Sequence, residues 1–206
     1  MGVRIRRAQE SDRDLVVGLL DAAFMDDPVS GWVLPGEEYR RARHARLMGV
    51  FTDVTYEEGF IDLAEDGSAA ALWVDVPAEP HRSEDGDAGE GGEDEAVQVR
   101  LAVDPDNERV EQIARWTSEI HPAGRAHAYL WMIGVAPDRQ GEGLGTALMA
   151  PVLERCDREG LPAYLEASNP RSRALYERLG FVFTGTALDL PDGPSLWPMW
   201  REPQQP

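Results

Sequence analysis

Residues 135–149 read VAPDRQGEGLGTALM and decide the fold of this chain. An extended run ends at Val135, and Gly141, Gly143 and Gly145 then allow the backbone to turn tightly before an apolar helical run begins. A helix that starts directly after such a turn presents unpaired N–H groups and a partial positive charge. The stretch therefore predicts a main-chain site for an anion such as a diphosphate.

Glycines at these positions can also be present only because a tight turn requires them. We therefore compare this stretch with the known nucleotide-binding patterns. The Rossmann pattern requires a glycine where this chain has Thr146, and a P-loop requires a lysine. All 20 basic residues are arginine, and lysine is absent from the sequence. The lysine chemistry of nucleoside triphosphatases and of pyridoxal enzymes is therefore excluded.

A second pattern follows at residues 168–181, SNPRSRALYERLGF. The run from Gln140 to Gly145 resembles the Gln/Arg-x-x-Gly-x-Gly coenzyme A signature of the Gcn5-related N-acetyltransferase (GNAT) family, and residues 168–181 resemble its second signature. Together the two signatures cover about residues 126–183. The segments HPAGRAHAYLWMIGVAPDRQGEGLG, LPAYLEAS, GPSLWPMW and AAFMDDP are similar to the puromycin N-acetyltransferase branch of this family.

The resemblance implies a fold class and a cofactor. The fold would be α+β or α/β, with a central mixed, mostly antiparallel sheet whose two parallel middle strands splay apart, flanked by helices. Acetyl-CoA, or coenzyme A, would lie between the splayed strands, and the Val135 N–H would stabilise charge on the thioester oxygen. The residues that this implies for cofactor binding are Ile133, Gly134, Val135, Arg139, Gln140, Gly141, Glu142, Gly143, Leu144, Gly145, Thr146, Asn169, Ser172 and Tyr176.

The candidate catalytic residues are Tyr176 and Glu166. By resemblance, the Tyr176 phenol donates a proton to the departing thiolate; a phenol has an ordinary pKa near 10 and a thiol one near 8.5. Glu166 stands in an apolar strand and is either a tuned general base or the partner of an arginine. His121 and His127 are further candidates for the base. Cys156 falls among apolar helix positions, which favours direct attack by an amine over a cysteine acyl-enzyme.

Phe24, Asp27 and Trp32 lie near the start of the chain and are candidates for an aromatic, acidic wall around a cationic amine. Simple packing of Trp32 in a core or loop is the alternative for that residue. The first hypothesis is acetyl-CoA-dependent N-acetylation of a primary amine of a small molecule, with antibiotic-like compounds among the candidates. Two alternatives stay open: acetylation of a protein or peptide N-terminus, and a catalytically silent module that binds acyl-CoA as a sensor.

Composition limits the other classes of function. Twenty basic and 38 acidic residues give a formal net charge of −18, which disfavours nucleic acid and anionic membrane surfaces as partners. No apolar run has the length of a spanning helix, and no apolar signal core follows Met1, so we expect a cytoplasmic protein. The single cysteine excludes an intrachain disulfide, and no metal cluster is apparent. We expect one domain over residues 1–206, as a monomer or homodimer.

Residues 77–95 hold eight acidic residues, one arginine and no large apolar side chain, which predicts a flexible acidic loop. Elsewhere, the periodicity predicts helices at 11–24, 37–56, 107–120, 143–159 and 170–179, and strands at 60–63, 69–76, 126–135, 162–167, 181–188 and 195–201. Trp32 is expected in a loop, and Pro151 is expected to bend its helix.

Overall fold

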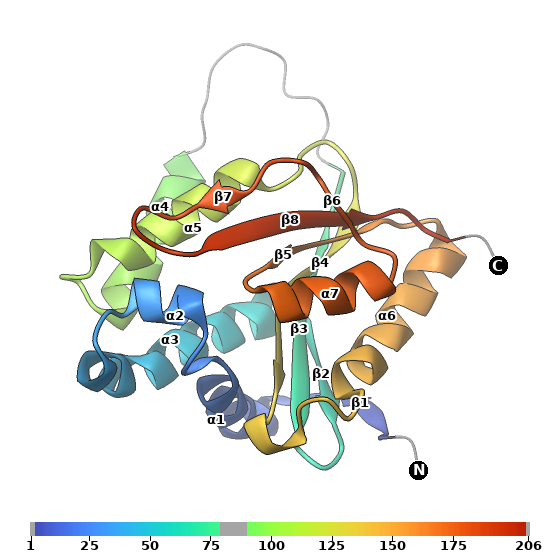
Figure 1. Cartoon of the computed structure of the whole chain (residues 1–206), viewed down its shortest axis with the longest axis horizontal. Helices are drawn as coiled ribbons and strands as arrows, with labels where there is room; N and C mark the ends of the chain where they lie inside the picture. Colours follow the sequence, from blue (N-terminus) through green and yellow to red (C-terminus); the bar gives the residue numbers. More distant parts are fainter. Residues whose placement is uncertain (1–2, 79–89, 205–206) are drawn as a thin grey trace.

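A computed structural model of the chain describes residues 3–78 and 90–204 (Figure 1). The strands are β1 (Ile5–Arg7), β2 (Phe60–Ala64), β3 (Ala69–Val76), β4 (His127–Val135), β5 (Ala163–Ala167), β6 (Val182–Phe183), β7 (Leu188–Asp189) and β8 (Ser195–Arg201). The helices are α1 (Arg13–Phe24), α2 (Pro28–Val33), α3 (Glu37–Glu58), α4 (Glu90–Val103), α5 (Glu108–Ile120), α6 (Leu144–Glu159) and α7 (Pro170–Arg178), with short 3-10 turns η1 (Glu10–Asp12) and η2 (Pro137–Arg139).

The strands lie in the order β1-β2-β3-β4-β5-β8-β6, and β7 pairs with β8. All neighbouring strands run antiparallel except β4 and β5, which are parallel. This is the mixed, mostly antiparallel sheet that the family resemblance implies.

The parallel pair is short. Residues 128–130 of β4 lie opposite residues 163–165 of β5, and the pairing ends there. β4 runs on to Val135 and stays paired with β3 along its other edge. In the described part of the chain, the β5-facing edge of β4 beyond Leu130 therefore has no strand partner, and the two strands form the splayed arrangement that the resemblance implies.

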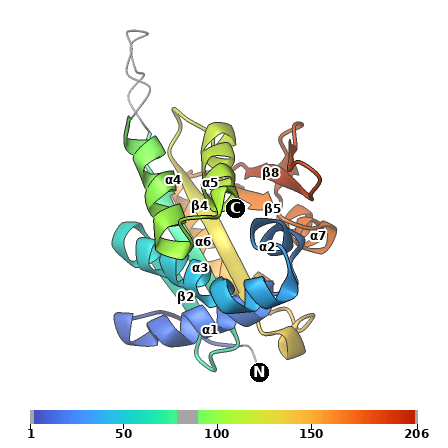
Figure 2. The same cartoon turned by 90° about the vertical axis from the view of Figure 1, so that its left-hand side faces the viewer.

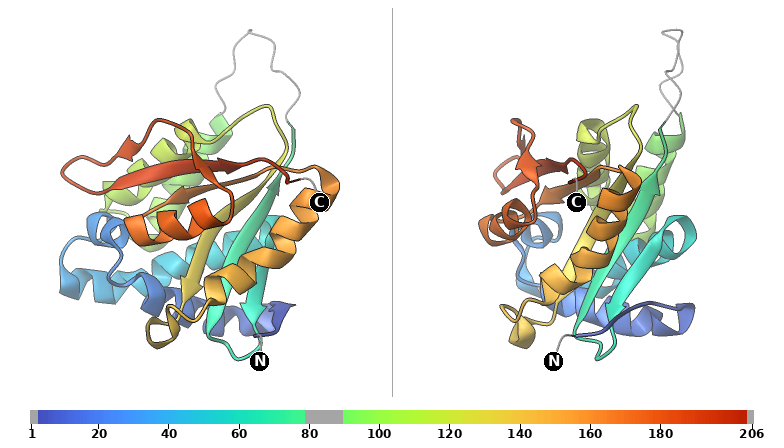
Figure 3. Two further views of the ribbon diagram at one scale, coloured as in Figure 1. Left: turned by 45° about the vertical axis from the view of Figure 1, so that its right-hand side comes forward. Right: turned by 90° about the vertical axis from the view of Figure 1, so that its right-hand side faces the viewer.

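Helices cover both faces of the sheet (Figure 3). α6 and α7 pack on one face, where Leu148 and Tyr176 join a core with Leu130 of β4. The helices from α1 to α5 pack on the other face, where Leu20 and Leu47 join a second core. Figure 2 shows α4 and α5 beside β4, with α3 and α1 below them in that view.

A β-bulge interrupts β4. Leu130 and Met132 lie opposite consecutive residues of β3, so Trp131 is an extra residue in β4. Leu130 packs into the core below α6, whereas Met132 packs into the core below the other helices. Trp131 also reaches this second side, because its ring centroid lies 5.0 Å from that of Phe51 in α3. Two adjacent large side chains therefore share one face of β4.

Two expected elements need correction. Trp32 lies in the short helix α2 and not in a loop, because the Asp27 carboxylate accepts a hydrogen bond from the Val29 N–H and Pro28 fits the first helical position. The residues that stop α1 therefore also start the next helix. The strand expected at 181–188 is split into β6 and β7. α6 continues through Pro151, and the bend there stays a prediction.

The acidic segment 77–95 agrees with the prediction only in part. Residues 79–89 lie outside the described residues, whereas residues 90–95 belong to the start of α4 and not to a loop. The later part of α4 supplies the apolar contacts that hold it: Ala96 and Val103 are buried, and Val99 packs against the second core. The sequence analysis missed this helix because its first half is acidic, and the apolar residues that pack it against the core all lie in its second half.

Candidate active site

A cleft of about 1630 Å³ opens between the diverging strands and continues along β4 to α3, α4 and α5. Its lining includes the glycine turn after β4, the start of α7, and both predicted catalytic residues, Glu166 and Tyr176. The cleft therefore brings together groups that lie far apart in the sequence.

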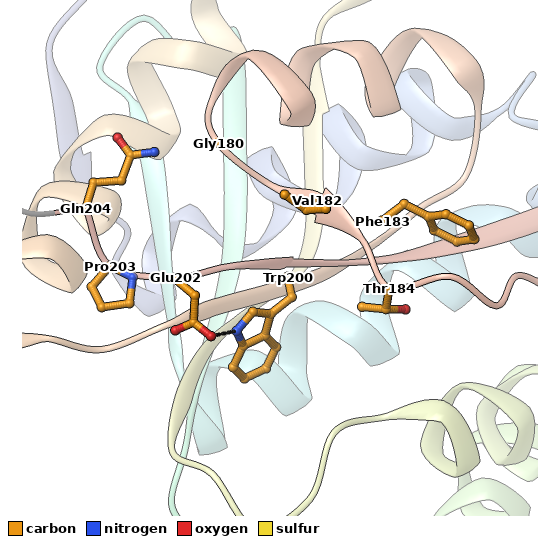
Figure 4. Close-up of a pocket in the computed structure, with 8 residues that line it drawn as sticks. All are labelled: Gly180, Val182, Phe183, Thr184, Trp200, Glu202, Pro203 and Gln204. Atoms are coloured by element: carbon orange, nitrogen blue, oxygen red, sulfur yellow. Dashed lines mark hydrogen bonds between the residues drawn. The ribbon is translucent and has the colours of Figure 1, made fainter.

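A second, smaller hollow of about 470 Å³ lies beside β6 and the end of β8 (Figure 4). The Trp200 indole N–H donates to the Glu202 carboxylate there at 3.0 Å, and Arg125 pairs with the same carboxylate. None of the residues predicted to bind the cofactor or to react lines this hollow. The larger cleft is therefore the candidate site.

The glycine turn has the geometry of an anion site. Gly141 and Gly143 have φ angles of 90° and 84°, in the left-handed region that favours glycine. Gly143 caps α6 without any side-chain hydrogen bond, and the first turn of α6 holds no acidic residue. The N–H groups of this turn are thus available to a diphosphate. Gly145 keeps α6 and α7 close, because a Cβ there would lie 3.1 Å from Leu175 Cδ2.

The free edge of β4 adjoins this turn. Ile133, Gly134 and Val135 pair with β3 on one side, and the parallel pairing with β5 has ended before them. An extended chain that carries amides can add to such an edge in the manner of an extra strand. Ile133 and Val135 line the cleft, and their side chains also pack against the core below α6. Gly134 lies close to α1, because a Cβ there would lie 2.9 Å from Leu20 Cδ2.

The arginines near the turn differ in their partners. Arg139 donates to Glu142 at 2.8 Å and to Asp66 at 3.3 Å, so carboxylates already compensate its charge. Arg171, at the start of α7, donates to the neutral Gln140 amide oxygen at 2.8 Å and has no carboxylate partner among the described residues. Arg171 is therefore the cation best placed for a phosphate. The sequence analysis missed it, although it stands in the first turn of the helix that follows Asn169.

Glu166 lies in β5, is of intermediate exposure and lines the cleft. Its Oε2 accepts a hydrogen bond of 2.8 Å from the Tyr129 hydroxyl, while its Oε1 is buried without a hydrogen-bond partner. Burial raises the pKa of Glu166 to about 7, and the hydroxyls of Tyr129 and Tyr164 oppose that rise. No arginine pairs with Glu166 among the described residues, so the structure gives no support to the arginine-partner alternative, and the role of general base stays a prediction.

The two histidines form a pair that packs against the rings of Tyr129 and Tyr164. His127 donates from Nδ1 to the Arg125 carbonyl oxygen at 2.7 Å, and its Nε2 lies 3.0 Å from Nε2 of His121. Because a carbonyl can only accept, His127 Nε2 carries the lone pair and His121 Nε2 carries the proton. Burial lowers the pKa of His121 to about 4 and also lowers that of His127. His121 is thus neutral at pH 7 and is a weaker base than Glu166.

Tyr176 is buried on α7, and it lines the cleft. Its hydroxyl makes no hydrogen bond with the described residues, so it is available to a ligand. Burial, followed by the nearby Asp27 carboxylate, raises the pKa of Tyr176 above its ordinary value. Proton transfer from a phenol to a thiolate is uphill by about 2 kcal/mol even at ordinary pKa values, and a raised pKa increases that cost. The Tyr176 hydroxyl therefore suits hydrogen bonding to a developing thiolate better than early proton transfer.

Asn169 and Ser172 line the cleft, but they already serve the start of α7. The Asn169 side chain accepts from the Ser172 N–H at 2.9 Å and donates to Asp27 at 3.3 Å. The Ser172 hydroxyl donates to the Asn169 carbonyl at 2.9 Å. Their first role in this structure is to cap a helix, and their contact with a cofactor stays a prediction.

The three predicted substrate residues do not all lie at the cleft. Phe24 and Asp27 line the cleft, whereas Trp32 is not part of its lining. The Trp32 indole donates to the Pro191 carbonyl, and its ring packs 6.0 Å from that of Trp116. The structure thus supports the packing alternative for Trp32. Both Asp27 oxygens are already bonded, one to the Val29 N–H and the other to the Ser168 hydroxyl and Asn169 amide.

Cys156 is fully buried on α6, and burial raises its pKa to about 11. A thiol with this pKa is protonated at neutral pH and does not act as a nucleophile. Within residues 3–78 and 90–204, no group of three or more His, Cys, Asp or Glu side chains is placed to hold a metal ion. No helix in this part of the chain has the length and apolar character to cross a bilayer.

Residues 93–181 match the profile of the family described as Acetyltransferase (GNAT) family. This segment contains the glycine turn, Glu166 and Tyr176. An uncharacterized N-acetyltransferase of Schizosaccharomyces pombe is 46% identical over 55 residues, which are 27% of this chain and 22% of that protein. A mycothiol acetyltransferase of Streptomyces coelicolor is 41% identical over 76 residues, which are 35% of this chain and 24% of that protein. In both cases the match spans only about a quarter of the relative.

Solved structures share the whole fold. A Corynebacterium glutamicum structure described as histone acetyltransferase HPA2 and related acetyltransferase has a TM-score of 0.69 and 23% identity, with 100% of this chain and 99% of that chain covered. Arylalkylamine N-acetyltransferase 2 of Aedes aegypti has a TM-score of 0.63 and 14% identity, with 99% and 100% covered. The fold is therefore the GNAT fold. The profile match covers residues 93–181, and the two curated relatives that match parts of the chain are named as acetyltransferases.

The two ends of α6 provide a matched test of the anion site. Gly143 and Gly160 both have positive φ angles, 84° and 68°, and a Cβ at either position would meet nothing within 4 Å. Gly143→Ala and Gly160→Ala should each cost about 1–2 kcal/mol of stability through backbone strain. Only Gly143→Ala should also weaken coenzyme A binding, by about tenfold, because it displaces N–H groups from the ligand. Calorimetric titration with coenzyme A measures this, and equal affinities of the two variants would refute the site.

The partly buried carboxyl of Glu166 should make stability depend on pH. Its pKa is raised to about 7, so the folded protein must hold a poorly solvated carboxylate above that pH, whereas Glu166 in the unfolded chain ionises near pH 4.5. Glu166→Gln should therefore stabilise the protein at pH 8 by up to about 3 kcal/mol, and by less than about 1 kcal/mol at pH 5. Urea unfolding at both values measures the difference. The exposed Glu154→Gln is the control, and a gain that did not grow with pH would contradict the assignment.

Proposed function

We propose that this protein transfers the acetyl group of acetyl-CoA to a primary amine of a small molecule by direct attack. The observation that carries the proposal is one cleft that joins a main-chain anion site, a free strand edge, a carboxyl with a pKa of about 7 and an unbonded tyrosine hydroxyl. When bound, acetyl-CoA supplies the acetyl group as an activated thioester. The residues of this chain must then bind it, deprotonate the amine and stabilise the departing sulfur.

Each group has a distinct role in this proposal. The N–H groups after Gly143, together with Arg171, hold the diphosphate, and the edge of β4 orients the arm that carries the thioester. Glu166 removes a proton from the attacking amine, which it can do because it is largely ionised above pH 7. The Val135 N–H would bind the thioester oxygen, and the Tyr176 hydroxyl would donate a hydrogen bond to the sulfur as charge develops there.

The relatives support N-acetylation without naming the acceptor of this chain. Mycothiol acetyltransferases and arylalkylamine N-acetyltransferases are among the similar proteins. The resemblance of the sequence to the puromycin N-acetyltransferase branch makes puromycin a reasonable member of an acceptor panel. Residues 22–28, AAFMDDP, carry part of that resemblance and end at the start of α2, beside the cleft.

The release of free thiol from acetyl-CoA over a panel of amines, with puromycin included, tests the proposed function. Tyr176→Phe should lower kcat by roughly 10- to 100-fold and change the Kd of acetyl-CoA by less than about threefold, because the hydroxyl acts on the leaving group. Tyr39→Phe is the control, since Tyr39 bonds to Asp104 and does not line the cleft. Binding of acetyl-CoA without thiol release from any amine or peptide would instead support the silent sensor module.

The role of Glu166 predicts a pH profile. For the wild-type protein, kcat/KM should rise as the pH passes about 7, because the carboxyl must lose its proton before it can act as a base. An acceptor amine with a pKa well above 9 adds only a steady slope in this range. Glu166→Gln should lower kcat/KM by about 100-fold at pH 8 and remove the inflection near pH 7. An unchanged inflection in the variant would assign that titration to another group.

A further inference from the structure

The part of the cleft away from the glycine turn has its own chemistry. It lies between β4 and the helices α3, α4 and α5, and we call it the acceptor chamber. Its large apolar lining residues include Phe51, Val54, Val99, Ile113, Trp131 and Met132. We infer that the acceptor is an amine with an aromatic or branched apolar body and without a carboxylate. This inference rests on the proposed function and names the substrate class for it.

The β-bulge builds the floor of the chamber. Because it interrupts the alternation of β4, Trp131 and Met132 both lie toward α3. The Trp131 ring is tilted by 58° against that of Phe51, with centroids 5.0 Å apart. A tilted aromatic pair next to a methionine offers broad apolar contact to a planar or branched group. Without the extra residue, one of the two side chains would lie on the opposite face of the sheet.

These side chains are only partly covered by the protein. Phe51, Trp131 and Met132 are of intermediate exposure, although each belongs to a residue type that is usually buried. All three line the cleft, so part of their apolar surface faces its interior. A ligand that covered such surface would gain about 25 cal/mol for each Å² removed from water. An amine with an apolar body would gain this binding free energy, whereas a small polar amine would leave the apolar surface of the chamber exposed to water.

Charge in the chamber selects against acids. Its charged residues among those described are Glu58 and Glu95, both exposed, and Glu166 lies where the chamber meets the cofactor side. The arginines that line the cleft, Arg171 and Arg178, stand on α7 and not on the chamber helices. His121 is neutral at pH 7, because burial lowers its pKa to about 4. Among the residues that the structure describes in the chamber, a carboxylate on the acceptor would therefore meet like charges and no cation, whereas an ammonium would be attracted.

Matched acceptors test this inference. 2-Phenylethylamine and phenylalanine share a body and differ by a carboxylate, phenylalanine methyl ester removes that charge, and ethanolamine lacks the apolar body. At equal concentrations of neutral amine, kcat/KM should be at least about 100-fold higher for 2-phenylethylamine than for phenylalanine or ethanolamine, and the ester should recover most of the difference. Equal transfer to phenylalanine or to ethanolamine would overturn the inference and leave the proposed function standing.

Variants of the chamber test whether it binds the acceptor amine and not acetyl-CoA. Trp131→Ala should raise the KM for 2-phenylethylamine by at least about tenfold with little change in the KM for acetyl-CoA, and Trp131→Phe should restore most of the loss. Phe183→Ala, an aromatic in the smaller hollow outside the cleft, is the control and should change neither value. Loss of acetyl-CoA binding in Trp131→Ala, or a full effect in the control, would overturn the assignment of the chamber.

A binding measurement keeps the two proposals distinguishable. Calorimetric titration of the coenzyme A complex with 2-phenylethylamine and with phenylalanine needs no turnover. Preferential binding of the first, without thiol release from any amine, would refute the proposed function and with it the role of the chamber as an acceptor site. Thiol release from other amines, with no binding of 2-phenylethylamine, would refute only the substrate class.

Discussion

The short parallel pairing between β4 and β5 is the constraint on which the site depends. Three residues pair, and the strands then separate while β4 remains held by β3. Because the pairing stops, β4 keeps a free edge, a cleft can enter the sheet, and the glycine turn after β4 faces the start of α7. A fully paired β4 and β5 would fill the same space with hydrogen bonds between strands. The reactive groups therefore come together where the sheet is incomplete.

Glu166 shows that such a site lowers the stability of the fold. It stands one residue beyond the last parallel pair, and its carboxyl has one bonded and one unbonded oxygen. Tyr129 and Tyr164 occupy directly paired positions on the two strands just before it. Their aromatic rings, packed with those of His121 and His127, exclude water and so destabilise the charged carboxyl. A group poised for proton transfer thus reduces the stability of the folded state at neutral pH.

The sequence predicted those features that depend on local pattern. Glycines with fixed backbone roles, the strand and helix periods and the two signatures placed the cofactor turn and Tyr176 in one fold. It did not predict α2, since Asp27 and Pro28 both end one helix and begin another, nor α4, whose acidic first half hides an apolar second half. Arg171 and Trp131 were missed for a different reason. Arg171 matters because it has no carboxylate partner among the described residues, and Trp131 matters because it is the extra residue of a β-bulge. Only the tertiary structure reveals either property.

The bonds of Asp27 have a mechanical consequence. One carboxylate oxygen holds the first turn of α2, and the other holds Ser168 and Asn169 at the point where α7 begins. The two walls of the cleft, which belong to distant parts of the chain, are thereby fastened to one another by a single side chain. Any displacement of α7 must carry α2 with it or break hydrogen bonds to a charged group. Asp27 therefore restrains the width of the cleft, because it links α2 on one side to the start of α7 on the other.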